Sequence, residues 1–159
     1  MFTKNRKPGR PLKDLRIGDR FEDKYQVKDR DILLYLGLSD DANPAYIQHD
    51  YAARTPQKKP IVPHLMLNGF IHAAISMQLP GPGSLIKEQQ VRYEKPLYHY
   101  DELTLKMVIT DIDREKREVT IDAEGKNSRG VTVLTAKLLV EPPPPGKPMT
   151  EQEETFENF

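Results

Sequence analysis

Residues 60–79 read PIVPHLMLNGFIHAAISMQL, the only long and nearly uninterrupted apolar stretch of the chain. Apolar side chains occupy most of the circumference of the helix that it predicts, which is typical of a helix wrapped by the rest of its domain. Pro63 suits the first turn, where an N–H has no intrahelical use. The run Leu79-Pro80-Gly81-Pro82-Gly83 ends the helix. The stretch is too short and too polar to span a bilayer.

The polar residues of this helix form a single stripe. His64, Asn68, His72 and Ser76 follow at steps of four, which places them along one slowly coiling line of the helix. We therefore expect Asn68 to extend the polar surface near the helix start, toward a ligand or toward a partner subunit. His72 lies two turns deeper, where a core or interface histidine is the commoner interpretation.

The segments around the helix predict the layer that wraps it. Before it come a strand ending near Val27, a helix capped by Asp29 or Asp31, and a short helix around residues 50–54. After it come four segments rich in Val, Leu, Ile or Thr: Ser84–Tyr93, Glu102–Ile112, Glu118–Glu124 and Val131–Val140. This order, a strand, then helices, then an antiparallel meander, predicts an α+β fold whose sheet curls around the long helix.

Composition narrows the class of protein. The chain has 159 residues, enough for one domain with a real core. Lysine plus arginine and aspartate plus glutamate number 24 each, so net charge indicates neither nucleic acid nor a membrane surface as a partner. There is no cysteine, and the four histidines form no ligand cluster, so we expect no metal and no cofactor. The absence of secretory and transmembrane patterns indicates a soluble, cytoplasmic protein.

The chain divides into three parts on this interpretation. Residues 1–13 are basic, carry prolines and glycine without apolar rhythm, and predict a loose arm. Residues 14–141 form the domain. Residues 142–159 begin with a proline run and continue as an acidic tail, for which we expect disorder or surface docking and no chemistry.

Four motifs carry a resemblance to a known family. The first is Leu38-Ser39-Asp40-Asp41-Ala42-Asn43-Pro44, a cluster of small, acidic and turn-forming residues. The others are KPIV at 59–62, LPGxGS at 79–84, and KPL at 95–97 with Asp101. Over roughly residues 15–140 the chain resembles MaoC-like proteins, the (R)-specific enoyl-CoA hydratases and 3-hydroxyacyl thioester dehydratases.

This resemblance implies a fold, an activity and an assembly. The fold is the hot-dog fold, and the activity is that of a lyase of fatty acid metabolism. It would hydrate 2-enoyl-CoA or dehydrate (R)-3-hydroxyacyl thioesters, carried on coenzyme A or on acyl-carrier protein. Hot-dog domains form homodimers by joining their sheets edge to edge, which also protects an exposed strand edge.

The family's catalytic pair, an Asp and a His five residues apart, is only half present. The resemblance places Asp41 at the position of the acid and keeps Asn43, which helps to hold the loop, whereas Tyr46 stands at the position of the histidine. The family also has a His-Gly pair at the start of the central helix, whose glycine N–H polarises the thioester carbonyl. That pair aligns with Pro63-His64 or, shifted by one, with His64-Leu65, and the backbone N–H of His64 or Leu65 could still serve.

The chemistry of the residues suggests how the missing histidine is replaced. A phenol is a poor base at neutral pH, so Tyr46 is a proton donor or simply fills space. The helix dipole at His64 disfavours the imidazolium form and keeps the ring basic. Our hypothesis is a relocated catalytic pair of Asp41 and His64 with Tyr46 as a helper; the alternative is that His64 only caps the helix. Ser84 either lines the acyl pocket, as in the family, or simply begins a strand.

The sequence leaves three functions open. The leading one is the hydratase or dehydratase activity. The loss of the signature histidine and glycine would also suit a non-catalytic domain that binds or senses acyl-CoA. The same fold hosts thioesterases, in which Asp41 would direct water at the carbonyl carbon.

Overall fold

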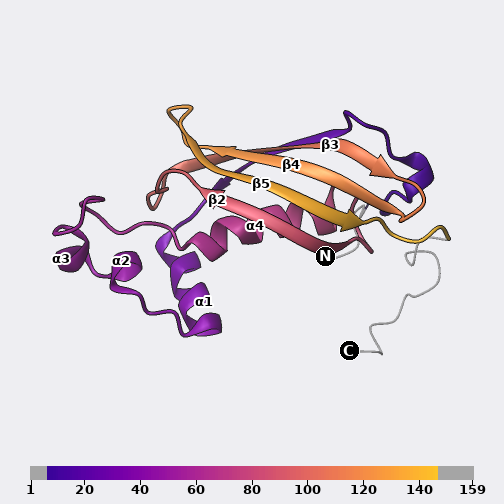
Figure 1. Cartoon of the computed structure of the whole chain (residues 1–159). Coiled ribbons are helices and arrows are strands. Elements are labelled where there is room, and N and C mark those ends of the chain that lie inside the picture. The colour runs from indigo at the N-terminus through magenta and orange to yellow at the C-terminus, as the bar shows by residue number, and fades with distance from the viewer. Residues whose placement is uncertain (1–6, 147–159) are drawn as a thin grey trace.

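The computed structural model describes residues 7–146 and contains one curled sheet over one long helix (Figure 1). The sheet is antiparallel and has the strand order β1-β3-β4-β5-β2. Its strands are β1 (Arg20–Gln26), β2 (Leu85–Tyr93), β3 (Glu102–Asp113), β4 (Glu118–Lys126) and β5 (Thr132–Glu141). The helices are η1 (Leu12–Asp14), α1 (Asp29–Ser39), α2 (Pro44–Ile47), α3 (His49–Ala52) and α4 (His64–Met77). The predicted α+β, hot-dog arrangement is confirmed.

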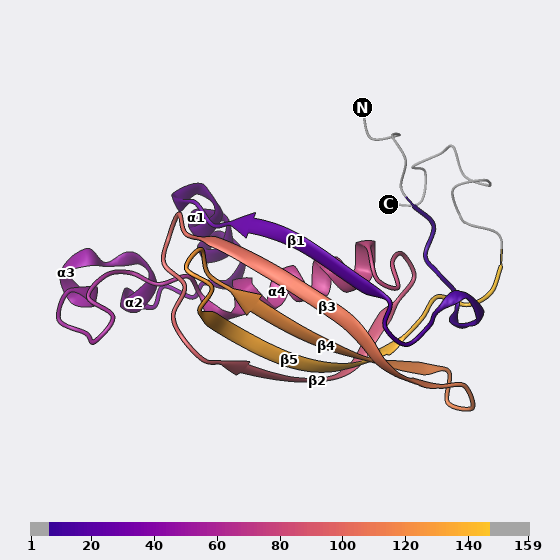
Figure 2. The same cartoon turned by 90° about the horizontal axis from the view of Figure 1, so that it is seen from above.

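The inner face of the sheet and the buried face of α4 make the core. Seen from above, α4 runs beneath the strands (Figure 2). On β3 the residues Leu103, Leu105, Met107 and Ile109 alternate inward and are almost completely buried. On α4, Leu67, Ile71, Ala74 and Ile75 are buried against them. Each such leucine or isoleucine contributes about 1.5–3 kcal/mol through the apolar surface that it removes from water.

The central helix begins and ends close to where the sequence predicts. Pro63 is the N-cap residue and lacks an N–H, so the first helical N–H is that of His64. The helix ends at Met77, and Gln78 caps it before the glycine-proline turn.

The short helices α2 and α3 form a segment that projects beyond one end of the sheet, and α1 leads into it (Figure 1). Instead of one helix near residues 50–54, two short helices follow each other, because Asn43 caps and Pro44 begins an earlier one. The N-cap of α1 is Lys28 rather than an aspartate, and its N–H donates to Asp31 Oδ2 at 2.9 Å. The projecting segment is tied to the domain through Ile61, whose N–H donates to Ala45 O at 3.1 Å.

Both ends of the described chain pack against the turn after α4. The N–H of Arg10 donates to Pro80 O at 2.9 Å, and the Arg10 guanidinium pairs with Asp19 at 2.6 Å. A Cβ on Gly83 would lie 2.9 Å from Pro143, which is buried there. From Gly9 onward, the segment predicted as a loose arm is therefore attached to the domain. The predictions for residues 1–6 and 147–159 lie outside the described residues.

Candidate active site

Asp41 lies just after α1, in a loop that is fixed by hydrogen bonds. Asp40 ends the helix in the left-handed conformation, with φ 56°, which changes the direction of the chain. The N–H of Asp41 donates to Ser39 Oγ at 3.2 Å, and Ser39 Oγ donates to Tyr35 O at 2.7 Å. The Tyr35 hydroxyl donates to Asp41 Oδ2 at 2.7 Å. One carboxylate oxygen of Asp41 is thereby held.

Tyr46 stands on α2, directly after the Asn43 cap. Asn43 Oδ1 accepts from the N–H of Ala45 at 3.0 Å, which satisfies a free donor of the first turn. Burial, and then the charge of Asp41, raise the pKa of the Tyr46 phenol, while the Asn43 side chain and the backbone of His64 act against this rise. The hydroxyl is thus protonated at neutral pH and close to both Asp41 and the start of α4.

His64 begins α4 and stacks on a tyrosine of the sheet. Its ring lies 4.1 Å from that of Tyr93, centroid to centroid, at an angle of 14°. Burial lowers the pKa of His64, so its imidazole is neutral at pH 7. The predicted neutral histidine is supported, with burial as the physical cause.

The start of α4 offers backbone donors next to this cluster. The N–H groups of Met66 and Leu67 reach back to Pro63 O, at 3.0 and 3.4 Å. The N–H groups of His64 and Leu65 precede them, where a helix has no internal acceptor. Leu65 itself is 59% exposed.

The structure links some of the predicted site residues and separates others. Asp41, Tyr46 and the His64 backbone are neighbours, and Tyr46 also acts on the pKa of Tyr93. Among the described residues no hydrogen bond joins the Asp41 carboxylate to the His64 ring, so the relocated pair stays a hypothesis.

Asn68 and Ser84 lie apart from this cluster, deeper in the domain. They are 6% and 8% exposed, and within the described part of the chain Asn68 Oδ1 and Ser84 Oγ have no hydrogen-bond partner. A buried polar atom of this kind calls for a partner, such as water or ligand. The substrate-binding roles predicted for both residues stay predictions.

Sequence reasoning missed two tyrosines of the site. Tyr35 precedes Asp41 by six residues, and the helical spacing from Tyr35 to Ser39 could have indicated that its side chain lies beside the loop. Tyr93 comes from β2, at the far edge of the sheet order from β1, and no spacing in the sequence connects it to His64.

A hollow of about 780 Å³ borders this cluster at His64 and Tyr93. Its other lining residues come from β2, β4 and β5 and are Gln90, Val91, Arg92, Asp122, Ala123, Thr135, Ala136 and Lys137.

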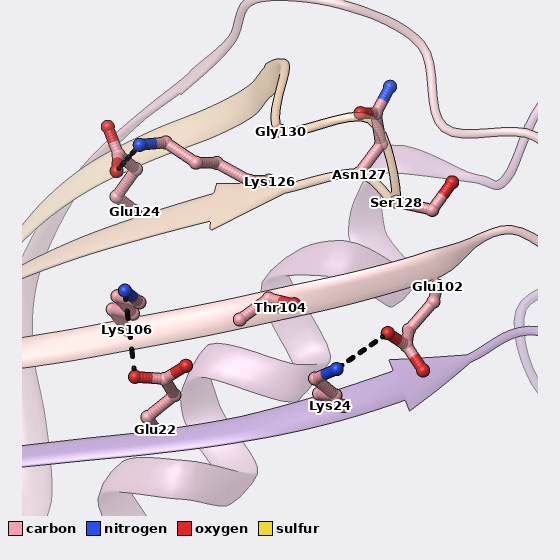
Figure 3. Close-up of a pocket in the computed structure, with 10 residues that line it drawn as sticks. All are labelled: Glu22, Lys24, Glu102, Thr104, Lys106, Glu124, Lys126, Asn127, Ser128 and Gly130. Atoms are coloured by element: carbon pink, nitrogen blue, oxygen red, sulfur yellow. Dashed lines mark ion pairs between the residues drawn. The ribbon is translucent and has the colours of Figure 1, made fainter.

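A second pocket, of about 340 Å³, lies on the outer face of β1, β3 and β4 (Figure 3). Its charges pair with one another, as Lys24 does with Glu102 at 3.1 Å and Lys126 with Glu124 at 3.0 Å. None of the predicted site residues lines it, so it carries no part of the candidate chemistry.

Two further properties concern the described residues, 7–146. They contain no group of three or more His, Cys, Asp or Glu residues that could hold a metal ion. No helix among them is long and apolar enough to cross a membrane.

A curled antiparallel sheet around one long helix defines a protein of the hot-dog fold. The profile of the MaoC like domain matches residues 16–130. The chain belongs to the MaoC-like family.

Named relatives agree with this assignment. An (R)-specific enoyl-CoA hydratase of Rhodospirillum rubrum is 33% identical over 82% of this chain and 85% of its own length. One of Aeromonas caviae is 25% identical over 81% of this chain and 96% of its own. An unliganded R-hydratase structure from Pseudomonas aeruginosa has a TM-score of 0.80 and 27% identity, covering 86% of this chain and 88% of that one.

Proposed function

We propose that this chain catalyses the (R)-specific addition of water to 2-enoyl-CoA and the reverse dehydration of (R)-3-hydroxyacyl-CoA. The relatives named as (R)-specific enoyl-CoA hydratases support this reaction class for the chain. The single observation that carries the proposal is the Asp41 carboxylate, fixed by Tyr35 and adjacent to Tyr46 at the start of α4. Hydration requires a base for water, a proton for C2 and donors for the enolate oxygen, and this site offers all three.

The reaction can be written with these groups. Asp41 takes a proton from water, the water oxygen bonds to C3, and the C2=C3 electron pair moves toward the thioester, whose oxygen becomes an enolate. The N–H groups at the start of α4 stabilise this enolate, helped by the helix dipole. Tyr46, kept protonated by its raised pKa, gives a proton to C2 and regains one from Asp41. The neutral His64 ring is the second acceptor for the attacking water.

The proposed substrate contacts follow the same geometry. Asn43 keeps the loop in place through its cap of α2, and Leu65 presents both an N–H and an exposed side chain to the thioester. Asn68 and Ser84 are proposed to contact the acyl part, where a ligand or water would satisfy their unpartnered oxygens. Coenzyme A is the proposed carrier, with acyl-carrier protein as the second candidate.

We also propose that the protein is a homodimer joined along β2, an edge strand of the sheet. α4 and the start of β2 leave Leu65, Met77 and Leu85 strongly exposed, which favours a covered face on this side. Strand pairing with a second copy would also satisfy the outward backbone groups of β2.

Turnover of crotonyl-CoA tests the activity. Hydration would show as a loss of the enoyl absorbance, and thioesterase activity as release of free thiol. A binding or sensing domain would bind the thioester tightly and give neither of these signals. Asp41→Asn should lower hydration on the order of 10² to 10⁴-fold because it removes the proposed base. The matched control is Asp40→Asn in the same loop, where asparagine tolerates the left-handed conformation and activity should stay within about twofold. Free thiol release by wild type, or an active Asp41→Asn variant, would reject the proposal.

A further inference from the structure

Tyr35 comes from α1 and contacts Asp41 through its hydroxyl. Its hydroxyl lies 2.7 Å from Asp41 Oδ2 and its backbone oxygen accepts from Ser39 Oγ at 2.7 Å. Ser39 in turn accepts from the N–H of Asp41 at 3.2 Å. The same tyrosine thus holds Asp41 at two points, at the carboxylate directly and at the backbone through a serine.

This arrangement determines which carboxylate oxygen is available. The Tyr35 hydroxyl donates to Oδ2, whereas no residue of the described chain donates a hydrogen bond to Oδ1, so Oδ1 has more acceptor capacity free for water. Asp41 follows a residue in the left-handed conformation at the end of a helix, and its side chain has several staggered rotamers to choose from. A hydrogen bond to a charged acceptor is among the stronger ones, and a few such contacts suffice to select one rotamer.

We propose that Tyr35 is a positioning residue that fixes Asp41 with Oδ1 facing the substrate water. This role rests on the proposed hydratase function, because it has meaning only if Asp41 is the base. Tyr35 itself is not expected to touch the thioester: it acts through Asp41 alone. Small displacements of a base cost rate, because proton transfer requires hydrogen-bonding distance and alignment.

Tyr35→Phe tests the role, since it keeps the ring and removes only the hydroxyl. We expect kcat for crotonyl-CoA hydration to fall about tenfold or more, as for loss of a hydrogen bond to a charged group, with KM unchanged. The matched control is Tyr98→Phe, which removes another tyrosine hydrogen bond, the one to Gln57 O at 3.0 Å, and should leave kcat within about twofold. The double variant Tyr35→Phe/Asp41→Asn should be no slower than Asp41→Asn, because Tyr35 acts only through that carboxylate.

A titration tests the contact without depending on turnover or on the fold of Tyr35→Phe. Burial, and then the hydrogen bond to Asp41, raise the pKa of the Tyr35 phenol. In Asp41→Asn this pKa should fall, as followed by NMR of the ring carbon Cζ of Tyr35. An unchanged pKa would overturn the proposal, because the contact would not exist in solution.

The kinetic outcomes separate the two proposals. Wild-type kcat in Tyr35→Phe, or effects of the two substitutions that multiply in the double variant, would overturn the positioning role while leaving the hydratase function intact. If wild type itself turns over no enoyl thioester, the proposed function fails and the role of Tyr35 fails with it.

Discussion

Tyr46 occupies the position at which the resemblance to MaoC-like proteins places a catalytic histidine. A raised pKa makes this phenol a donor at neutral pH, whereas a histidine could accept the proton of water. Asp41 is therefore left as the proposed base, and the two residues divide the work that an Asp-His pair would share.

Removing the Tyr46 hydroxyl should slow protonation at C2. We expect Tyr46→Phe to lower kcat for crotonyl-CoA on the order of 10²-fold, as for loss of a general acid. Tyr51→Phe on α3 is the matched control, because Tyr51 is largely exposed and should contribute no such step. The rate at which deuterium from the solvent is incorporated at C2 of the 3-hydroxyacyl product provides a second readout. Equal rates for Tyr46→Phe and wild type would show that another group delivers the proton.

His64 makes a prediction about stability and pH. Burial lowers the pKa of His64 from its ordinary value of 6.5. At a pH between the pKa of the folded state and that of the unfolded state, the unfolded chain therefore binds more protons. The contribution of His64 to stability is complete at a pH above the unfolded-state pKa, and it is lost as the pH falls below that pKa. His64→Gln removes this titration, so its melting temperature should drop less than that of wild type between pH 7.5 and 5.5. A drop equal to that of wild type would contradict the burial of a neutral ring.

Among the elements, those with long apolar patterns were predicted closely. The ranges of α4 and of the four strands after it follow from periodicity, because a buried helix or strand face must repeat with its own period. The expected four-strand meander is wrong for β2: β3, β4 and β5 are neighbours in chain order, but β2 pairs with β5 instead of β3. The two short helices α2 and α3 were not separated, since four residues carry too little pattern. The residues around Asp41 also differ in how well the sequence predicts them. The roles of the Asp41 loop and of Tyr46 follow from the resemblance to the family, whereas Tyr93 depends on strand packing that no local rule gives.

Gly125 lies on β4 where the inner face of the sheet is most crowded. A Cβ there would be 2.9 Å from Leu103 Cδ1 and 3.2 Å from Leu134 Cγ. We expect Gly125→Ala to lower the free energy of unfolding by about 1–3 kcal/mol through overpacking, measured by urea denaturation. Gly37→Ala on α1 is the control: apart from its own helix backbone and chain neighbours, no atom of the described residues would lie within 4 Å of an added Cβ, so it should stabilise by about 0.5–1 kcal/mol. A neutral Gly125→Ala would mean that the two leucines can move aside.

At the scale of the whole molecule, the sheet has two edges, β1 and β2, that differ in their surroundings. Beside β1 lies α1, at one end of that strand (Figure 2), whereas β2 itself begins with an exposed leucine, Leu85. In an antiparallel ladder every second residue of an edge strand directs its N–H outward, where only solvent or another strand can accept it.

The proposed homodimer therefore predicts different hydrogen exchange at the two edges. Outward amides of β2 should exchange slowly because a second copy of β2 accepts them, while outward amides of β1 exchange quickly and serve as the internal control. Sedimentation at micromolar concentration should give twice the 18.3 kDa of one chain. Dilution shifts the equilibrium from dimer toward monomer. It should therefore raise the hydrogen-exchange rate of the outward β2 amides and leave that of the β1 amides unchanged. A dimer with fast-exchanging β2 amides would place the interface elsewhere, and a monomer at these concentrations would reject it.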